Sequence, residues 1–358
     1  MPILDKTDKK KTAELNKFFK TSQYGNYYQS PEWAEIKSDN WKNEYVYLEE
    51  NGEIVAGMLI LIRKIAKGFT MMYSTRGPVA DFNNISQINK LIKEVEPLVK
   101  KYKPFVLKMD PEIEEDEEIK TALRKSDFKV KSDFKNILEL MQTIRTMELD
   151  IENKTEEEIM AEYSQKTRYN IRVAIKKGVK VRYSNSEDDL KKFYKLMQVT
   201  AKRDQIAVRS YEYYKKIVDA YKDNARIYIA EYNGEPLAAA IAINYAKKVT
   251  YFYGASSNEN RNLMPCYIMQ QTMIEWAIET KCKAYDFGGI FNTTKDNGLY
   301  RFKEGFCRKK GATKFIGEID KVYNKPKYFI FSKVLPKVKG LMLFINSKKQ
   351  KMKNKSKN

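Results

Sequence analysis

Alternation of apolar and polar residues predicts two β-hairpins in distant parts of the chain. The first covers residues 46–61, VYLEENGEIVAGMLIL, and the second covers residues 227–243, IYIAEYNGEPLAAAIAI. In each, two apolar runs flank an Asn-Gly pair, which readily adopts the backbone conformation of a tight hairpin turn. The pattern therefore predicts the same structural unit twice, about 180 residues apart.

The residues after each hairpin continue the repeat. Each hairpin is followed by a tyrosine-containing strand, an amphipathic helix and an apolar strand that ends in a carboxylate. These elements are expected at residues 71–74 and 250–253, 85–102 and 266–280, and 105–110 and 283–286. Hairpin, strand, helix and strand together form a mixed α/β module. Its repetition predicts an α/β protein with mixed sheets and two similar domains packed together; chance similarity of two hairpins is the alternative.

Capping residues predict four more helices. A Ser-Pro pair opens the first, the capping box of Thr155 and Glu158 opens the second, and serines open the other two. The four helices are expected at residues 31–37, 155–178, 186–202 and 210–221. In the second, Arg168, Arg172 and Lys176 follow at i, i+4 spacing and share one face. This basic stripe is a candidate site for tRNA phosphates, and a solvated basic face explains it nearly as well.

The chain has 358 residues, which suits about two domains, and it is strongly basic. It contains 67 Lys and Arg against 47 Asp and Glu, a formal net charge of +20. This excess favours a polyanionic partner: nucleic acid, nucleotide phosphates or an anionic membrane face. Residues 332–358 hold nine Lys and no acidic residue, and they include the apolar run 341–345. We expect this tail to make peripheral contact with a membrane; a solvated C-terminus is the alternative.

Composition excludes several classes of site. The chain has no His, which excludes an imidazole base, Ser-His-Asp and Cys-His arrangements and most catalytic zinc sites. Three Cys without CxxC spacing argue against a disulfide framework or structural zinc and fit a reducing cytoplasm. The N-terminal residues MPILDKTDKKK lack the apolar region of a signal peptide. Because the longest apolar runs are far shorter than the ~20 residues that span a bilayer, we expect a soluble cytoplasmic protein.

Acetyltransferase-like domains hold the CoA pyrophosphate on a loop of the form Arg/Gln-x-x-Gly-x-Gly/Ala, where backbone N–H groups approach the phosphates. Neither repeat has this loop. Residues 256–265, SSNENRNLMP, contain no Gly, and in residues 74–78, STRGP, a Pro follows the single Gly and removes a donor. A different acyl donor is therefore expected, and a CoA-dependent N-acetyltransferase is the weaker alternative.

Four separated motifs resemble the FemABX family of non-ribosomal peptidyltransferases. They are YSTRGPV at residues 73–79, LKMDPE at 107–112, YDFGGI at 285–290 and LYRFKEGF at 299–306. The resemblance covers nearly the whole chain and is closest to shorter members without a coiled-coil arm. It implies tandem N-acetyltransferase-like (GNAT) domains. Residues 1–147 with 318–358 would form the first, acceptor-binding domain, and residues 148–317 the second.

The resemblance also implies an activity. Family members transfer an amino acid from aminoacyl-tRNA to the side-chain amine of residue three of a peptidoglycan stem peptide, which builds the interpeptide bridge. The acceptor would be UDP-MurNAc-pentapeptide or its lipid-linked form. Because the aminoacyl ester is already activated, we expect no cofactor and no metal. The enzyme would act as a monomer in the cytoplasm or at the inner face of the cell membrane.

By the matching motifs, the resemblance implies two catalytic residues, Lys303 in LYRFKEGF and Asp110 in LKMDPE. The fixed charge of Lys303 would stabilise the oxyanion or the leaving tRNA end. Asp110 would attract or deprotonate the acceptor amine. Other basic and aromatic residues would bind the acceptor or line its cleft: Lys37, Arg209, Tyr213, Arg76 and Tyr253.

An RNA-binding module without catalysis is the main alternative, because such proteins are also basic and rich in aromatic residues. The substitution Lys303→Met separates the two hypotheses. A binding module has no reason to lose function on this substitution while it keeps its affinity for RNA.

Overall fold

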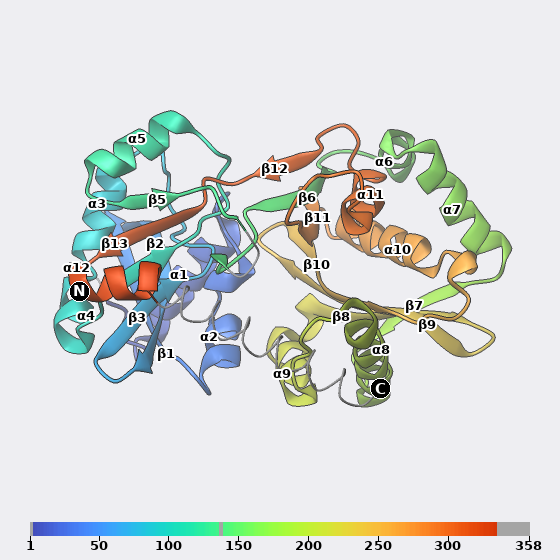
Figure 1. Ribbon diagram of the computed structural model, residues 1–358, viewed down its shortest axis with the longest axis horizontal. Helices are drawn as coiled ribbons and strands as arrows, with labels where there is room; N and C mark the ends of the chain where they lie inside the picture. The colour runs from blue at the N-terminus through green and yellow to red at the C-terminus, as the bar shows by residue number, and fades with distance from the viewer. Residues whose placement is uncertain (1–2, 136–138, 335–358) are drawn as a thin grey trace, which may run out of the picture.

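The structure is a computed structural model that describes residues 3–135 and 139–334, and it contains two mixed β-sheets (Figure 1). The strands of the first sheet are, in spatial order, β1 (Lys42–Glu50), β2 (Glu53–Ala66), β3 (Phe69–Ser74), β4 (Val106–Met109), β13 (Glu318–Val322) and β5 (Lys129–Lys131). Neighbours are antiparallel except for the parallel pair β3 and β4. Strand β13 comes from near the end of the described chain, so the chain returns to the first sheet after it has built the second.

The second sheet repeats this pairing. Its strands are, in spatial order, β12 (Ala312–Lys314), β6 (Arg145–Asp150), β11 (Ala284–Gly289), β10 (Lys248–Ser256), β9 (Glu235–Tyr245), β8 (Ala225–Tyr232) and β7 (Lys180–Ser184). The pair β10 and β11 is parallel and the other neighbours are antiparallel. The module predicted from the sequence is therefore present twice.

Both predicted hairpins are confirmed. The backbone φ angles are 51° at Asn51 and 81° at Gly52, and 52° at Asn233 and 82° at Gly234. Two consecutive positive φ angles are what a type I′ hairpin turn requires. The Asn-Gly pairs thus connect β1 to β2 and β8 to β9, and they fix the register of each hairpin.

The prediction of one continuous helix at residues 85–102 is wrong. The structure has two helices there, α3 (Ile85–Lys93) and α4 (Glu96–Tyr102). Pro97 lacks a backbone N–H, and inside a continuous helix its ring would clash with the carbonyl group four residues earlier. In the first turn of α4 the missing donor is tolerated, so the chain breaks the helix just before it.

The helix predicted at residues 155–178 is also two helices, α6 (Glu156–Glu162) and α7 (Gln165–Lys176). Tyr163 between them has an extended backbone, and Ser164 caps α7 by accepting a hydrogen bond from a backbone N–H. The Tyr163 side chain is fully buried. The break therefore directs this aromatic ring into the core, which a straight helix would not do.

The four predicted N-terminal caps are confirmed. Ser30, Thr155, Ser186 and Ser210 each accept a hydrogen bond from a backbone N–H of the following first turn. The remaining helices are α1 (Lys9–Thr21), α2 (Pro31–Lys37), α5 (Glu117–Lys125), α8 (Glu187–Asp204), α9 (Tyr211–Tyr221), α10 (Pro265–Glu279), α11 (Gly298–Glu304) and α12 (Lys325–Phe329). Of all helices in residues 3–135 and 139–334, none has the length and apolar character required to cross a bilayer.

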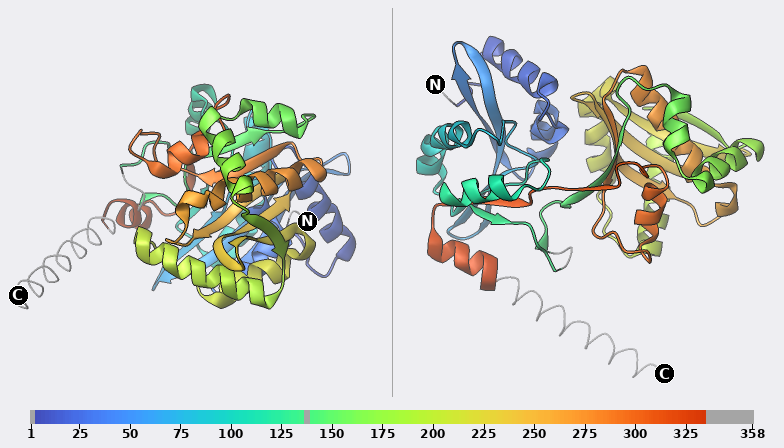
Figure 2. Two further views of the ribbon diagram at one scale, coloured as in Figure 1. Left: turned by 90° about the vertical axis from the view of Figure 1, so that its right-hand side faces the viewer. Right: turned by 90° about the horizontal axis from the view of Figure 1, so that it is seen from above.

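The two halves of the molecule share a core. The largest group of buried apolar side chains combines α1, α2, β1 and β2 with α8, α9, β8 and β9. Separate groups cover the other face of each sheet, with α3 and α5 on the first and α7 and α10 on the second (Figure 2). The shared core holds the halves against each other, so side chains from both can form one site. The expected domain boundaries remain a prediction, and the basic tail at residues 335–358 lies outside the described residues.

Candidate active site

Lys303 lies on α11 and is buried, with 4% of its surface exposed. Its Nζ donates hydrogen bonds to the carbonyl oxygens of Gly288 at 2.9 Å and Gly289 at 3.0 Å. Gly288 has a φ of 77°, and a Cβ atom there would stand 3.3 Å from the backbone oxygen of Tyr251. Burial lowers the pKa of Lys303 to about 8, and the charge of Asp286 opposes this shift. At neutral pH this lysine is therefore mostly a cation.

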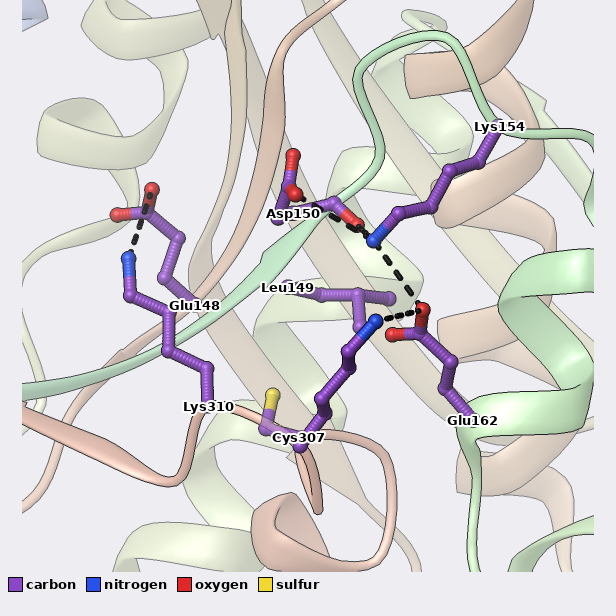
Figure 3. Close-up of a pocket in the computed structure, with 8 residues that line it drawn as sticks. Glu148, Leu149, Asp150, Lys154, Glu162, Cys307 and Lys310 are labelled. Carbon is purple, nitrogen blue, oxygen red and sulfur yellow. Dashed lines mark hydrogen bonds and ion pairs between the residues drawn. The ribbon is translucent and has the colours of Figure 1, made fainter.

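A cavity of about 220 Å³ lies beside the segment that follows α11 (Figure 3). Its charged lining consists of three carboxylates and three lysines, namely Glu148, Asp150, Glu162, Lys154, Lys309 and Lys310. These charges pair with one another: for example, Lys154 lies 3.2 Å and Lys309 lies 3.4 Å from Glu162. Burial raises the pKa of the Cys307 thiol in the same lining. The cavity thus has a balanced charge and a protonated thiol, which suits neither a polyanion nor a thiolate nucleophile.

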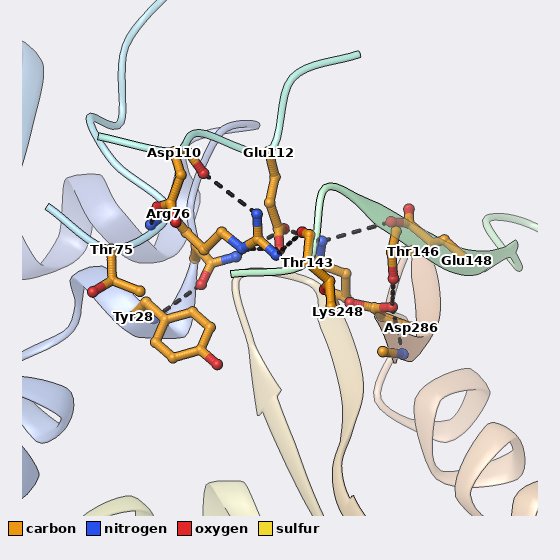
Figure 4. A network of polar contacts seen from close by, with 12 residues as sticks. Tyr28, Thr75, Arg76, Asp110, Glu112, Thr143, Thr146, Glu148, Lys248 and Asp286 are labelled. Carbon is orange, nitrogen blue, oxygen red and sulfur yellow. Dashed lines mark hydrogen bonds and ion pairs between the residues drawn. The ribbon is translucent and has the colours of Figure 1, made fainter. Parts of the chain in front are cut away.

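A buried chain of charges connects the two halves, from Arg76 in the first to Lys248 in the second (Figure 4). Glu112, in the first half, lies 3.3 Å from Nε of Arg76 and 3.0 Å from Nζ of Lys248, at the start of β10. Burial raises the pKa of Glu112, but the charges of Lys248 and Arg76 outweigh this and lower the pKa overall. Glu112 is therefore a carboxylate held by one cation from each half.

Asp286 of β11 continues this chain toward Lys303. One of its carboxylate oxygens accepts hydrogen bonds from the Thr146 hydroxyl at 2.6 Å and from the Gly288 N–H at 2.8 Å. Burial raises the pKa of Asp286, while the charge of Lys248 opposes the shift. The negative charge of Asp286 also favours the cationic form of Lys303. Asp286 therefore connects the buried chain of charges to that lysine.

Asp110 lies at the other end of the network and is buried. Its two carboxylate oxygens accept hydrogen bonds from the Tyr73 hydroxyl and the Arg76 N–H, each at 2.6 Å. Burial raises the pKa of Asp110 to about 6, and the charge of Arg76 opposes the shift. Asp110 is therefore ionised at neutral pH. Among the described residues it makes no direct contact with Lys303, so the structure does not bring the two predicted catalytic residues together.

Arg76 is also buried, and its guanidinium is occupied by the protein itself. Besides the ion pair with Glu112, it donates hydrogen bonds to the Thr143 carbonyl at 2.8 Å and to the Asp110 carbonyl at 3.4 Å. This arrangement ties the loop after β3 to the segment between the two sheets. The geometry gives Arg76 a role in positioning the interface.

Lys37, Arg209 and Tyr213, three predicted substrate-binding residues, line one cavity of about 410 Å³. The Lys37 ammonium lies 4.5 Å from the ring centre of Trp33 and 5.4 Å from that of Tyr213, and the Arg209 guanidinium lies 5.6 Å from the Tyr213 ring. Burial and the charge of Arg209 lower the pKa of Lys37 to about 8. The lining also contains the carboxylates Asp39 and Glu212, and Asp39 pairs with Lys216 at 2.6 Å. The Lys37 and Arg209 side of the cavity suits a phosphate or carboxylate group.

Tyr253 lies next to this cavity without lining it. Its ring meets that of Tyr213 edge-on, with the ring centres 6.4 Å apart, and burial raises the pKa of Tyr213 to about 12. Two further basic residues, Arg63 and Lys216, line the cavity and were not predicted. Lys216 lies on α9 three residues after Tyr213, so the two side chains share one face of the helix. This spacing is the one sequence signal that could have indicated Lys216. Nothing in the local sequence around Arg63 pointed to the cavity.

Arg168, Arg172 and Lys176 all lie on α7, so the predicted stripe shares one helix although the longer helix is broken. Arg172 and Lys176 are exposed. The Arg168 guanidinium donates to the carbonyl groups of Ala161 and Tyr163 and thereby caps the end of α6. Arg172 Nε also donates a hydrogen bond to the Arg168 carbonyl group at 3.3 Å. Arg172 and Lys176 are therefore accessible to a polyanion, while Arg168 is partly engaged with α6.

A family model named FemAB family matches residues 11–235 and 231–335 of this chain. The UDP-N-acetylmuramoylpentapeptide-lysine N(6)-alanyltransferase of Weissella viridescens is 31% identical over 336 residues, which cover 92% of this chain and 98% of that protein. A lipid II:glycine glycyltransferase of Staphylococcus epidermidis is 29% identical over 404 aligned positions, which cover 92% of this chain and 96% of that protein.

Solved structures share the fold. The crystal structure of FemX matches with a TM-score of 0.84 at 24% identity and covers 93% of this chain and 100% of its own. A tandem GNAT protein from the clavulanic acid biosynthesis pathway matches with a TM-score of 0.52 at 7% identity and covers 89% and 96%. The expected α/β fold with tandem GNAT-like modules is therefore confirmed. Since the family match extends over most of the sequence, the chain belongs to the FemAB family.

Proposed function

We propose that this protein is an aminoacyltransferase of peptidoglycan synthesis. It moves an amino acid from aminoacyl-tRNA to the side-chain amine of residue three of the stem peptide, on UDP-MurNAc-pentapeptide or its lipid-linked form. The names of the two relatives support the acceptor, because one is a UDP-N-acetylmuramoylpentapeptide-lysine alanyltransferase and the other a lipid II:glycine glycyltransferase. A transfer assay with labelled aminoacyl-tRNA and both acceptors tests the proposal.

The observation that carries the proposal is the cavity in which Lys37, Arg209 and Tyr213 meet. Lys37 comes from the first half and the other two from the second, so the cavity forms only when the halves are packed together. Both possible acceptors carry a diphosphate, and two cations beside a tyrosine hydroxyl suit such a group. The pKa of Lys37 is lowered by burial and by the charge of Arg209, which supports a site where an anion would be favourable.

The reaction requires one bond to form and one to break. The acceptor amine attacks the ester carbonyl, a C–N bond forms, and the C–O bond to the tRNA ribose breaks. The amine loses a proton, and the ribose oxygen gains one. The Lys303 cation stabilises the negative oxygen of the tetrahedral intermediate or the leaving oxygen. Asp110 attracts the acceptor ammonium by its charge, and Arg76 and Tyr253 hold the walls of the acceptor cleft in place.

The cavity cations are expected to set acceptor affinity. Arg209→Met should raise KM for the acceptor about 10- to 100-fold, the loss of a charged hydrogen bond, while kcat stays within about threefold. Steady-state kinetics with the UDP-linked acceptor measure both constants. The matched control is Lys215→Met, which removes a cation from α9, the helix that begins just after Arg209. Lys215 pairs with Asp219 and does not line the cavity. A KM that Arg209→Met leaves unchanged removes this residue from the acceptor site.

The donor site is proposed on α7. Replacement of Arg168, Arg172 and Lys176 by Ala should weaken aminoacyl-tRNA binding about tenfold or more, and it should reduce the slope of log affinity against log salt, since fewer counterions are released. Filter binding over a range of salt concentrations measures both. Wild-type affinity that does not vary with salt would contradict tRNA as the donor, and an unchanged slope in the variant would place the tRNA elsewhere.

The same proposal includes the organisation of the enzyme. Residues 1–147 with 318–358 form the acceptor-binding domain and residues 148–317 the second domain. The protein works as a monomer in the cytoplasm or at the inner face of the cell membrane. Analytical ultracentrifugation of the full chain tests the monomeric state.

A further inference from the structure

The described chain ends in a short helical segment with two different faces. Helix α12 (Lys325–Phe329) continues directly into a single wider turn, η5 (Ile330–Val334), and we call the two together the terminal helix. It packs along the first sheet, on the side of β3 and β4 (Figures 1 and 2).

The inner face of the terminal helix is anchored to the first sheet. The Tyr328 hydroxyl donates a hydrogen bond to Asp320 of β13 at 2.7 Å, and Lys327 donates one to the Gly68 carbonyl at 2.7 Å. The Phe331 ring packs against Phe105, with the ring centres 5.1 Å apart. These contacts fix which side of the helix faces outward.

The outer face is apolar and basic. Phe329, Ile330 and Val334 are 61%, 40% and 40% exposed. Nine large apolar side chains are exposed in the whole described chain, and these three fall within six residues. Lys325 and Lys333 are exposed on the same segment. The inner-face contacts explain why the helix forms, but they do not explain three exposed apolar side chains on the opposite face.

We propose that the outer face of the terminal helix is a membrane-contacting surface that rests on an anionic phospholipid bilayer. Its apolar side chains would enter the region between headgroups and acyl chains, and the lysines would meet lipid phosphates. Charge complementarity extends beyond this face, because residues 332–358 contain nine Lys and no acidic residue. Each lysine near an anionic surface adds to this attraction. A second copy of this chain, with its net charge of +20, offers no comparable match to so one-sided a positive charge.

The position of this surface has a consequence for the acceptor, which rests on the proposed function. Trp41 packs against the same small cluster, Met71, Phe105 and Val106, as the inner face of the terminal helix. Trp41 also lines the cavity that contains Lys37 and Arg209. The terminal helix and the acceptor cavity thus contact the same small cluster, so a membrane at the outer face would lie on the cavity's side of the first half, which favours a lipid-linked acceptor.

The test is vesicle co-sedimentation with the full chain. The wild type should bind vesicles of phosphatidylcholine with phosphatidylglycerol and bind vesicles of phosphatidylcholine alone much less. The triple variant Phe329→Ser, Ile330→Ser, Val334→Ser should bind the anionic vesicles at least ~20-fold less, since three apolar side chains no longer leave water. The matched control is the triple variant Ile175→Ser, Val199→Ser, Ile206→Ser, whose side chains are 59%, 38% and 52% exposed on the second half; it should bind like the wild type.

Two results would contradict the proposed membrane surface. The wild type would fail to bind anionic vesicles, or the variant of Phe329, Ile330 and Val334 would bind them as well as the wild type does. If the wild type instead dimerises and that variant does not, the face belongs to a second copy of the chain. Circular dichroism confirms that the variants fold.

Transfer assays separate this inference from the proposed function. The variant of Phe329, Ile330 and Val334 should keep transfer to the soluble UDP-linked acceptor and lose transfer to the lipid-linked acceptor in vesicles. If the wild type transfers to neither acceptor, the proposed function fails, while the vesicle measurement still decides the membrane surface.

Discussion

Lys303→Met is expected to lower kcat about 100-fold or more while the fold is retained, because it removes a cation that stabilises charge in the transition state. The methionine side chain has a similar length and suits the buried position. Its cost to stability is limited to the two hydrogen bonds that Nζ donates to Gly288 and Gly289. Single-turnover kinetics with saturating aminoacyl-tRNA and acceptor measure the effect on the chemical step.

Two controls distinguish a catalytic role from a structural one. Lys309→Met removes an exposed lysine six residues further along the chain and should leave kcat within about twofold, as for a surface ion pair. The second control is the pH profile. Burial lowers the Lys303 pKa from 10.5 to about 8, so the cation is present below pH 8 and is lost as pH rises through this value. Wild-type kcat should fall on that alkaline side, and in Lys303→Arg the fall should move to higher pH. A loss of less than tenfold in Lys303→Met would remove this residue from the catalytic role.

Lys108→Met is expected to lower the free energy of unfolding by about 3–5 kcal/mol, because it leaves two buried carboxylates without their cation. The Lys108 ammonium lies 2.8 Å from Glu318 and 2.8 Å from Asp320, and these side chains are 7%, 6% and 7% exposed. Asp320 also accepts the hydrogen bond from Tyr328, so the loss extends to the anchor of the terminal helix. Urea unfolding followed by tryptophan fluorescence and circular dichroism measures the change.

Lys321→Met is the matched control for this second prediction. Lys321 lies on β13 next to Asp320, and its partner Asp127 is 3.3 Å away and strongly exposed. An exposed pair of this kind contributes at most about 1 kcal/mol. If the two variants lose the same free energy of unfolding, the burial of Lys108 does not make its ion pairs more important for stability than an exposed pair.

The elements that the sequence predicted well are those governed by local rules. The two Asn-Gly turns and the caps at Ser30 and Ser210 depend only on residues within a few positions of each other, and all are confirmed. The module was also visible twice because its strands and helices recur in the same order. Helix α1 was missed, since its buried residues Leu15 and Phe19 pack into the core cluster formed by other elements of both halves.

The site was predictable only in part, for the same reason. The motifs indicated Lys37 and Arg209, but their meeting in one cavity depends on how the two halves pack. The ion pair between Glu112 and Lys248 joins residues from both halves and has no local pattern, although Glu112 and Asp286 stand inside the quoted motifs. The break at Tyr163 likewise reflects tertiary burial that helical spacing does not reveal.

The central claim is that fixed cations, rather than an imidazole base, promote transfer from an RNA ester to a muropeptide amine. The most direct measurement incubates the purified chain with a labelled pool of aminoacyl-tRNA and either the UDP-linked or the lipid-linked acceptor. Mass spectrometry should find one amino acid added to the stem-peptide amine, with stoichiometric deacylation of its tRNA. If both acceptors stay unmodified and the tRNA retains its amino acid as it does in buffer, the claim is wrong.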